Sequence, residues 1–419
     1  MNYLNKFGFI LLILFSSIIP FHFYSENFGI FYLYREMMAA IFLLLLLINL
    51  YGAGPIPIRP RKEVFYLMLF PFLLLLSAIY DPMELLYKEQ YYMGGGSVSD
   101  ISQINVDPRI YILRNAVIYL PMTFYIAVRG LSEKEISQIA LFSVLVAPFS
   151  VLGYLLDLLE SGTFSIFLLG EMTEKGRGLI AYNSYVPYLS FPVISGMYLL
   201  SSKNSLATKI MVLASISIVS IFIFLSSSRQ TILFIVIGIV TFVLVGSSKA
   251  NLKRVFMFSL SALAIYLSFL YIMADYKLDE ALLEKYQYGE NSRFAVIFDG
   301  ILRLEFYQYL IGAGLSSVID SGPHNDYVRW TQRVGIFFMI IAFIPYYMIG
   351  FKCLGRVLKN RNDLLSLYFG FGVAFVIYHS VFGYPREDAF QAIWCYLGIA
   401  MSLGYSTYLK QRELLNKNI

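Results

Sequence analysis

Charged residues are scarce in this chain: they make up 14% of its 419 residues, whereas 58% are apolar. Soluble globular domains carry roughly 25% charged residues, so the composition excludes an ordinary soluble fold. The apolar residues come in blocks of about 17–24, and about 20 helical residues are needed to cross a bilayer core. The alternating ten-residue segments of an outer-membrane barrel are absent. The sequence therefore predicts an all-α, polytopic integral membrane protein.

Cysteine and histidine are rare as well, with two and three residues. Two cysteines exclude a disulfide framework, and no group of histidines and carboxylates has the spacing of a metal site. The chain also lacks a Walker loop and a dinucleotide fingerprint, which excludes the common nucleotide-binding sites. We therefore expect no metal, no cofactor and no nucleic-acid partner.

Twelve apolar segments are long enough to span a membrane, and they form a single membrane domain over residues 1–419. The expected spans are residues 7–24, 28–51, 64–80, 109–128, 137–157, 179–200, 210–226, 230–246, 255–273, 334–351, 364–382 and 391–408. Alternate connections hold more than half of the 32 basic residues: Lys6; Arg59, Arg61, Lys62; Arg129, Lys134; Lys203, Lys209; Lys249, Lys253, Arg254; Lys352, Arg356, Lys359, Arg361; and Lys410, Arg412, Lys417. By the positive-inside rule these connections and both termini are cytoplasmic.

Two predicted outer connections are unusually long. Residues 81–108 contain three consecutive glycines and are typical of a flexible linker or a lid. Residues 274–333, between the ninth and tenth spans, form the only extramembrane segment of domain-like size. Loops of this length are usually functional or disordered. Helical apolar spacing at 281–288 and 293–311 predicts that this loop is ordered.

Arginine is enriched on the predicted outer side, whereas most lysines lie in cytoplasmic connections. Arginine binds phosphate and carboxylate in a bidentate manner, which lysine does not. The enrichment indicates either an anionic ligand or ordinary pairing with outer acids such as Asp299 and Glu305. Six residues near this face are candidates for binding such a ligand: Arg35, Arg177, Asn183, Arg229, Arg293 and Arg303.

Each of these arginines also has a structural interpretation. Arg35 precedes Glu36 inside a predicted span, where a buried ion pair is the more ordinary interpretation. Arg177 lies at a membrane edge, where anchoring arginines are common. Arg229 lies in a tight turn between two apolar spans, where a charge needs a partner or a water-filled cavity.

His324 follows a glycine-proline turn in the long loop and precedes Asn325 and Asp326. A histidine can take a proton from a hydroxyl near neutral pH, which is the role of a general base. The alternative is a loop histidine that is satisfied by Asp326. His379, near the outer end of the predicted span 364–382, is equally open to a functional and a structural interpretation.

The order of these motifs resembles the O-antigen polymerase and O-antigen ligase superfamily. The run Gly312-x-Gly314, His324-Asn325, nine residues and Gly335 is similar to the long periplasmic loop of that family. In the ligases a glycine, threonine or tyrosine follows three positions after the last glycine, and this chain has Phe338 there.

Other residues add to the resemblance. Arg303, ten residues and Gly314 fit the Arg-x10-Gly pattern of polymerase loops, and Arg229 and Arg177 look like further landmarks. No such pattern begins at Arg177, so that match is partial. The resemblance covers most of the chain as topology and some 160 residues as motif.

The resemblance implies a GT-C-like, metal-independent, inverting glycosyltransferase in the bacterial inner membrane, with an active site that faces the periplasm. The implied donor is an oligosaccharide linked to undecaprenyl diphosphate, a membrane lipid, and a chain-length regulator is a candidate partner. An O-antigen polymerase is favoured, and an O-antigen ligase that acts on lipid A-core, or a non-enzymatic exporter, are the alternatives. The implied catalytic residues are His324, Arg177 and Arg293; the implied substrate-binding residues are Arg229, Arg303, Asn183, Asn325 and Arg35.

Overall fold

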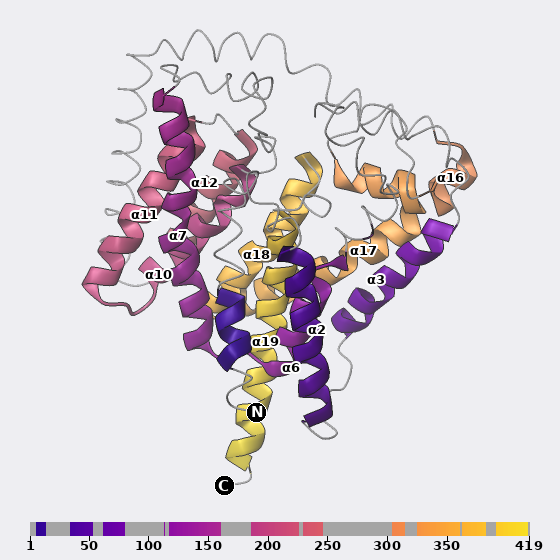
Figure 1. Cartoon of the computed structure of the whole chain (residues 1–419), viewed down its shortest axis with the longest axis horizontal. Helices are drawn as coiled ribbons and strands as arrows, with labels where there is room; N and C mark the ends of the chain where they lie inside the picture. Colours follow the sequence, from indigo (N-terminus) through magenta and orange to yellow (C-terminus); the bar gives the residue numbers. More distant parts are fainter. Residues whose placement is uncertain are drawn as a thin grey trace.

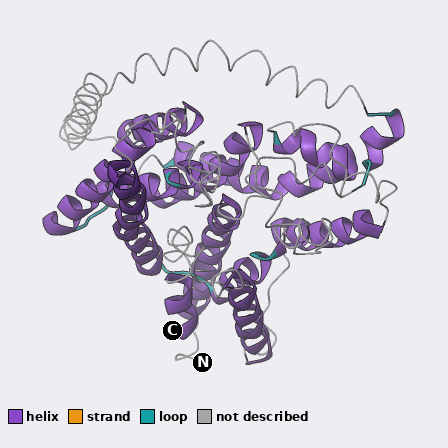
Figure 2. Cartoon of the chain, turned by 45° about the horizontal axis from the view of Figure 1, so that its top comes forward, coloured by secondary structure: helices purple, strands orange, loops and turns teal. Residues whose placement is uncertain are grey.

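The computed structural model describes residues 6–13, 34–52, 62–79, 113, 117–160, 186–225, 229–245, 304–314, 325–360, 363–382 and 391–417. Within these ranges the regular elements are helices, and Figure 2 shows no strand among them. The helices with defined bounds are α2 (Tyr34–Gly52), α3 (Lys62–Ile79), α6 (Leu120–Arg129), α7 (Glu133–Glu160), α10 (Ser190–Ser201), α11 (Leu206–Leu225), α12 (Arg229–Val245), α16 (Phe306–Ile311), α17 (Asp326–Lys359), α18 (Leu364–Phe382) and α19 (Gln391–Lys417). The predicted all-α class is confirmed for this part of the chain.

Four of the described helices, α3, α11, α17 and α18, are long and apolar enough to cross a membrane, and α2, α10 and α12 contain shorter apolar helices. They overlap the predicted spans, and four described helices of this length and apolarity are compatible with a membrane protein. The faces of these helices that point away from the bundle carry large exposed apolar side chains, which is the surface expected against lipid. Examples are Leu43, Phe65, Phe72, Ile210 and Leu233. The predicted span 255–273 and most of 7–24 lie outside the described residues.

Proline interrupts two of the predicted spans. Because proline has no backbone N–H, the carbonyl four residues earlier loses its helical partner. In the predicted span 109–128 a turn at residues 118–119 precedes Pro121, and in the span 179–200 a turn at residue 189 precedes Pro192. The regular helices α6 and α10 therefore begin later than the apolar segments do.

Helix α18 lies at the centre of the bundle. It packs against α17, α19, α10 and α12, with α3, α16 and α17 on one side and α7, α10, α11 and α12 on the other (Figure 1). The ring of Tyr368 stacks on Tyr198 with centroids 4.8 Å apart, and its hydroxyl lies 2.8 Å from Ser195 Oγ. Gly398 faces Gly372 so closely that a Cβ would lie 2.8 Å from its carbonyl carbon, which lets α18 and α19 touch through their backbones.

Two contacts between α3 and α17 each join helix ends that are predicted to lie on the same side of the membrane. On the predicted inner side Lys352 of α17 forms an ion pair with the buried Glu63 at the start of α3. On the outer side Ser77, near the end of α3, donates to the carbonyl of Arg333 at 3.4 Å. This arrangement agrees with the alternation that the basic residues predict.

The first described helix and the last helix reach the same end of the bundle. The guanidinium of Arg129 lies 5.6 Å above the ring of Phe9, and Gly130 packs against the backbone of Tyr408. Leu131 N–H donates to the Gly404 carbonyl at 3.0 Å.

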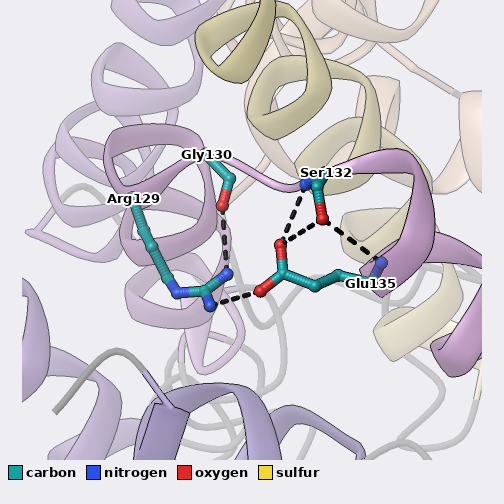
Figure 3. A network of polar contacts seen from close by, with 4 residues as sticks. All are labelled: Arg129, Gly130, Ser132 and Glu135. Carbon is teal, nitrogen blue, oxygen red and sulfur yellow. Dashed lines mark hydrogen bonds and ion pairs between the residues drawn. The ribbon is translucent and has the colours of Figure 1, made fainter. Parts of the chain in front are cut away.

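A polar network closes the loop between α6 and α7 (Figure 3). The carboxylate of Glu135 accepts from Arg129 at 2.5 Å, and from the backbone and hydroxyl of Ser132 at 2.9 Å each. Ser132 in turn caps the first turn of α7, so the pair forms a capping box. Burial raises the pKa of Glu135, but the hydrogen bonds from Arg129 and Ser132 together hold it below its ordinary value of 4.5.

The substitution Glu135→Gln is expected to destabilise the protein by about 1 kcal/mol at neutral pH, because it removes the charge that Arg129 binds. A depressed carboxyl pKa stabilises the fold above the unfolded value and loses this effect as pH falls through the folded value. The gap in melting temperature between wild type and E135Q should therefore narrow below about pH 4.5. Tryptophan fluorescence, to which the buried Trp330 contributes, reports unfolding at both neutral and acidic pH. A difference in melting temperature that does not change with pH would contradict the lowered pKa of Glu135.

Candidate functional site

The candidate site lies at the N-terminus of α17, on the predicted outer side of the membrane. Asn325 is the N-cap of this helix, and its side-chain oxygen accepts from the Val328 N–H at 3.1 Å. Its side-chain nitrogen donates to the Val381 carbonyl in the last turn of α18, also at 3.1 Å. The residue before it in the sequence is His324, which lies outside the described residues.

A break at Gly335 explains the nine-residue spacing of the motif. Gly335 has φ 81° and ψ 165°, so α17 is two helices, one over 326–334 and one from residue 336 to Lys359. The predicted span began at residue 334, and residues 326–333 were expected to belong to the long outer loop. They are instead a short helix between the N-cap and the glycine.

The Gly312-Ala313-Gly314 segment docks on the end of this short helix. Ala313 N–H donates to the Gln332 carbonyl at 2.7 Å, and Gly314 N–H donates to the Arg333 carbonyl at 3.3 Å. The helix breaks at Gly335, so both carbonyls lie in its last turn, where carbonyls accept from donors outside the helix. Gly312 must be a glycine here, since a Cβ would lie 2.2 Å from the Arg333 carbonyl oxygen.

The two halves of α17 fold back on each other. Tyr327 and Phe343 are 16 residues apart, which is about 24 Å along a straight helix, yet their ring centroids are 4.4 Å apart. The Tyr327 hydroxyl also lies 3.1 Å from that of Tyr347 and from the Ile377 carbonyl of α18. The short helix therefore lies over the outer part of the bundle, between the ends of α18 and α3.

This unit buries an unusual number of polar side chains. Asp326, Arg333 and Gln332 are at most 1% exposed, and Ser380 donates to Asp326 at 3.4 Å. A buried charge near hydrocarbon is costly, and residues of this kind are usually functional. Sequence reasoning did not select Arg333, although a charge one residue before a predicted span was an available signal.

His379 lies beside this polar group, on the face of α18 that meets α12. Its ring is 4.4 Å from Phe375 and 5.4 Å from Phe234, centroid to centroid, and it is 1% exposed. Neither ring nitrogen has a hydrogen-bond partner among the described residues. The contact with Phe234 brings the outer end of α12, where Arg229 begins the helix, beside the outer end of α18.

The predicted site residues are thus only partly placed. Asn325 and the backbone of Arg229 lie at neighbouring helix ends, whereas Arg35 is in the first turn of α2, which packs against α6. The remaining predictions fall outside the described residues: His324, Arg177, Arg293, Arg303 and Asn183. The described residues contain no cluster of histidine, cysteine and carboxylates that could hold a metal ion.

The chain matches no protein-family model and no curated protein. Its function is therefore argued from the chemistry of its own residues.

Proposed function

We propose that the chain is an O-antigen polymerase of the bacterial inner membrane, with about twelve spans and a GT-C-like plan. It joins undecaprenyl-diphosphate-linked repeat units at the periplasmic face. One observation carries most weight: one short helix connects the three pieces of the motif, because Asn325 caps its start and Gly312-x-Gly314 and Gly335 lie at its end. Both glycine pieces are required there, since a Cβ on Gly312 or Gly335 would collide with backbone atoms.

The proposed reaction transfers the glycan from its diphosphate to a sugar hydroxyl of a second lipid-linked unit. His324 takes the proton of that hydroxyl, and the oxygen attacks the anomeric carbon of the donor from the opposite face. The bond from that carbon to the phosphate oxygen breaks, and undecaprenyl diphosphate leaves with the bonding electrons. Arg177 and Arg293 stabilise the charge that develops on the leaving group.

The remaining arginines have supporting parts in this proposal. Arg229 and Arg303 bind the donor, together with Asn183, and Arg35 orients the substrate. A diphosphate is strongly anionic, and bidentate arginines suit its oxygens. Arg333 adds a buried positive charge next to the same helix ends.

The proposal is tested with purified protein in lipid nanodiscs and EDTA. The substrate is the lipid-linked oligosaccharide that accumulates in the host strain after deletion of this gene. We expect a ladder of products that are longer by whole repeat units, and no ladder with empty nanodiscs. Transfer only after lipid A-core is added would identify a ligase instead, and no product under either condition would favour an exporter.

A further inference from the structure

Three consecutive residues at the start of α17 form hydrogen bonds with the last turns of α18. Asn325 donates to the Val381 carbonyl at 3.1 Å, and Tyr327 donates to the Ile377 carbonyl at 3.1 Å. Between them the Asp326 carboxylate accepts from Ser380 at 3.4 Å. We call these three contacts the outer clasp. They fix the first turn of one helix to the end of another that lies more than fifty residues away in the sequence.

The side chain of Asn325 performs two separate tasks. Its oxygen caps α17 through the Val328 N–H, while its nitrogen makes the clasp contact with Val381. The residue is 8% exposed, so little of its amide faces solvent. Both ends of the amide are therefore engaged with backbone.

We propose that Asn325 is a positioning residue: it ties the start of α17 to the last turn of α18 and so fixes the residue to which His324 is bonded. This inference rests on the proposed function, because it takes His324 as the base. Consecutive Cα atoms are about 3.8 Å apart, so fixing Asn325 restricts the positions that His324 can occupy. The outer ends of α12 and α18 meet near this point, and the assignment replaces the substrate-binding role predicted for Asn325.

One substitution separates the two tasks. Aspartate caps helices about as well as asparagine, so Asn325→Asp keeps the bond from Val328. It has no N–H to offer to the Val381 carbonyl, and its charge repels that oxygen. The clasp is then lost, and the buried charge facing the unpartnered Val381 carbonyl should lower the melting temperature, whereas the retained cap keeps α17 folded. The matched control is Asn360→Asp, the same chemical change at the other end of α17, where the side chain is exposed.

The kinetic test compares both variants in the polymerisation assay. For N325D we expect kcat to fall about 10–100-fold, the cost of misplacing a reacting group by about 1 Å. KM should stay within about twofold, since the substrate contacts remain. N360D should match wild type. A rise in KM at unchanged kcat would instead show that Asn325 binds substrate. If neither kcat nor KM changed, Asn325 would act only as a helix cap. Each of these results overturns the proposal.

A second readout does not depend on activity. Diethyl pyrocarbonate modifies accessible histidines, and mass spectrometry of the His324 peptide gives the rate. We expect this rate to rise about fivefold in N325D, as loss of one hydrogen bond increases local opening, while the buried His379 stays unreactive. An unchanged rate at His324 overturns the clasp. If wild type makes no polymer but the rate rises, the proposed function fails and the clasp stands.

Discussion

Replacement of His324 by alanine is expected to lower the rate of polymerisation by about 10²–10⁴-fold, the usual contribution of a general base. The acceptor hydroxyl then has no group to take its proton as it attacks the donor. Binding of the lipid-linked donor should remain, because the arginines that we propose to bind its diphosphate are unchanged. Band intensities over time give the rate, and a filter assay with radiolabelled donor gives the affinity.

His324→Gln provides the matched control for this result. Glutamine keeps hydrogen-bonding capacity at the position but cannot accept a proton near neutral pH. It should therefore be as slow as alanine. The wild-type kcat should rise with pH around the ordinary histidine pKa of about 6.5, and this rise should vanish in both variants. A variant that keeps more than about a tenth of the wild-type rate would exclude His324 as the base.

Replacement of Gly335 by alanine is expected to destabilise the protein by about 3–5 kcal/mol, the largest stability effect that we predict for one methyl group. Its backbone lies in a region that only glycine occupies freely. A Cβ would also lie 2.1 Å from the Leu310 carbonyl oxygen, a backbone atom that cannot move alone. The short helix 326–334 and the segment 312–314 should separate. The melting temperature read from tryptophan fluorescence measures the effect.

The control is Gly355→Ala, later in the same helix. A Cβ on Gly355 meets nothing within 4 Å, and alanine is favoured over glycine in helices by about 1 kcal/mol. This variant should melt at or above the wild-type temperature. If G335A melted with it, the close contact between Gly335 and Leu310 would be refuted.

The sequence predicted the helices that are defined by apolar length. Helix α18 was expected at residues 364–382, where it lies, because polar residues flank an unbroken apolar block. Helix α19 was expected to end at residue 408 and continues to Lys417. The extension is polar and exposed, and hydropathy does not distinguish a polar helix from a loop.

The candidate site was less predictable, for a physical reason. Residues 326–333 are rich in polar side chains and were expected in the outer loop, but they form a buried helix. Their surroundings come from distant helices: Ser380 donates to the Asp326 carboxylate, and Ser77 donates to the backbone carbonyl of Arg333. A single sequence reveals that Asp326 and Arg333 are charged; it does not reveal what surrounds them.

The outer clasp also sets an order of events during synthesis. Val381 follows Asn325 by 56 residues, so a ribosome that adds about 5–20 residues per second delivers it about 3–11 s later. For that interval the nascent chain has no α18 against which the start of α17 can close. A chain that stalls or is cut before residue 381 contains His324 and Asn325 and still cannot assemble the clasp. The outer clasp therefore forms only after the whole of α18 has been translated.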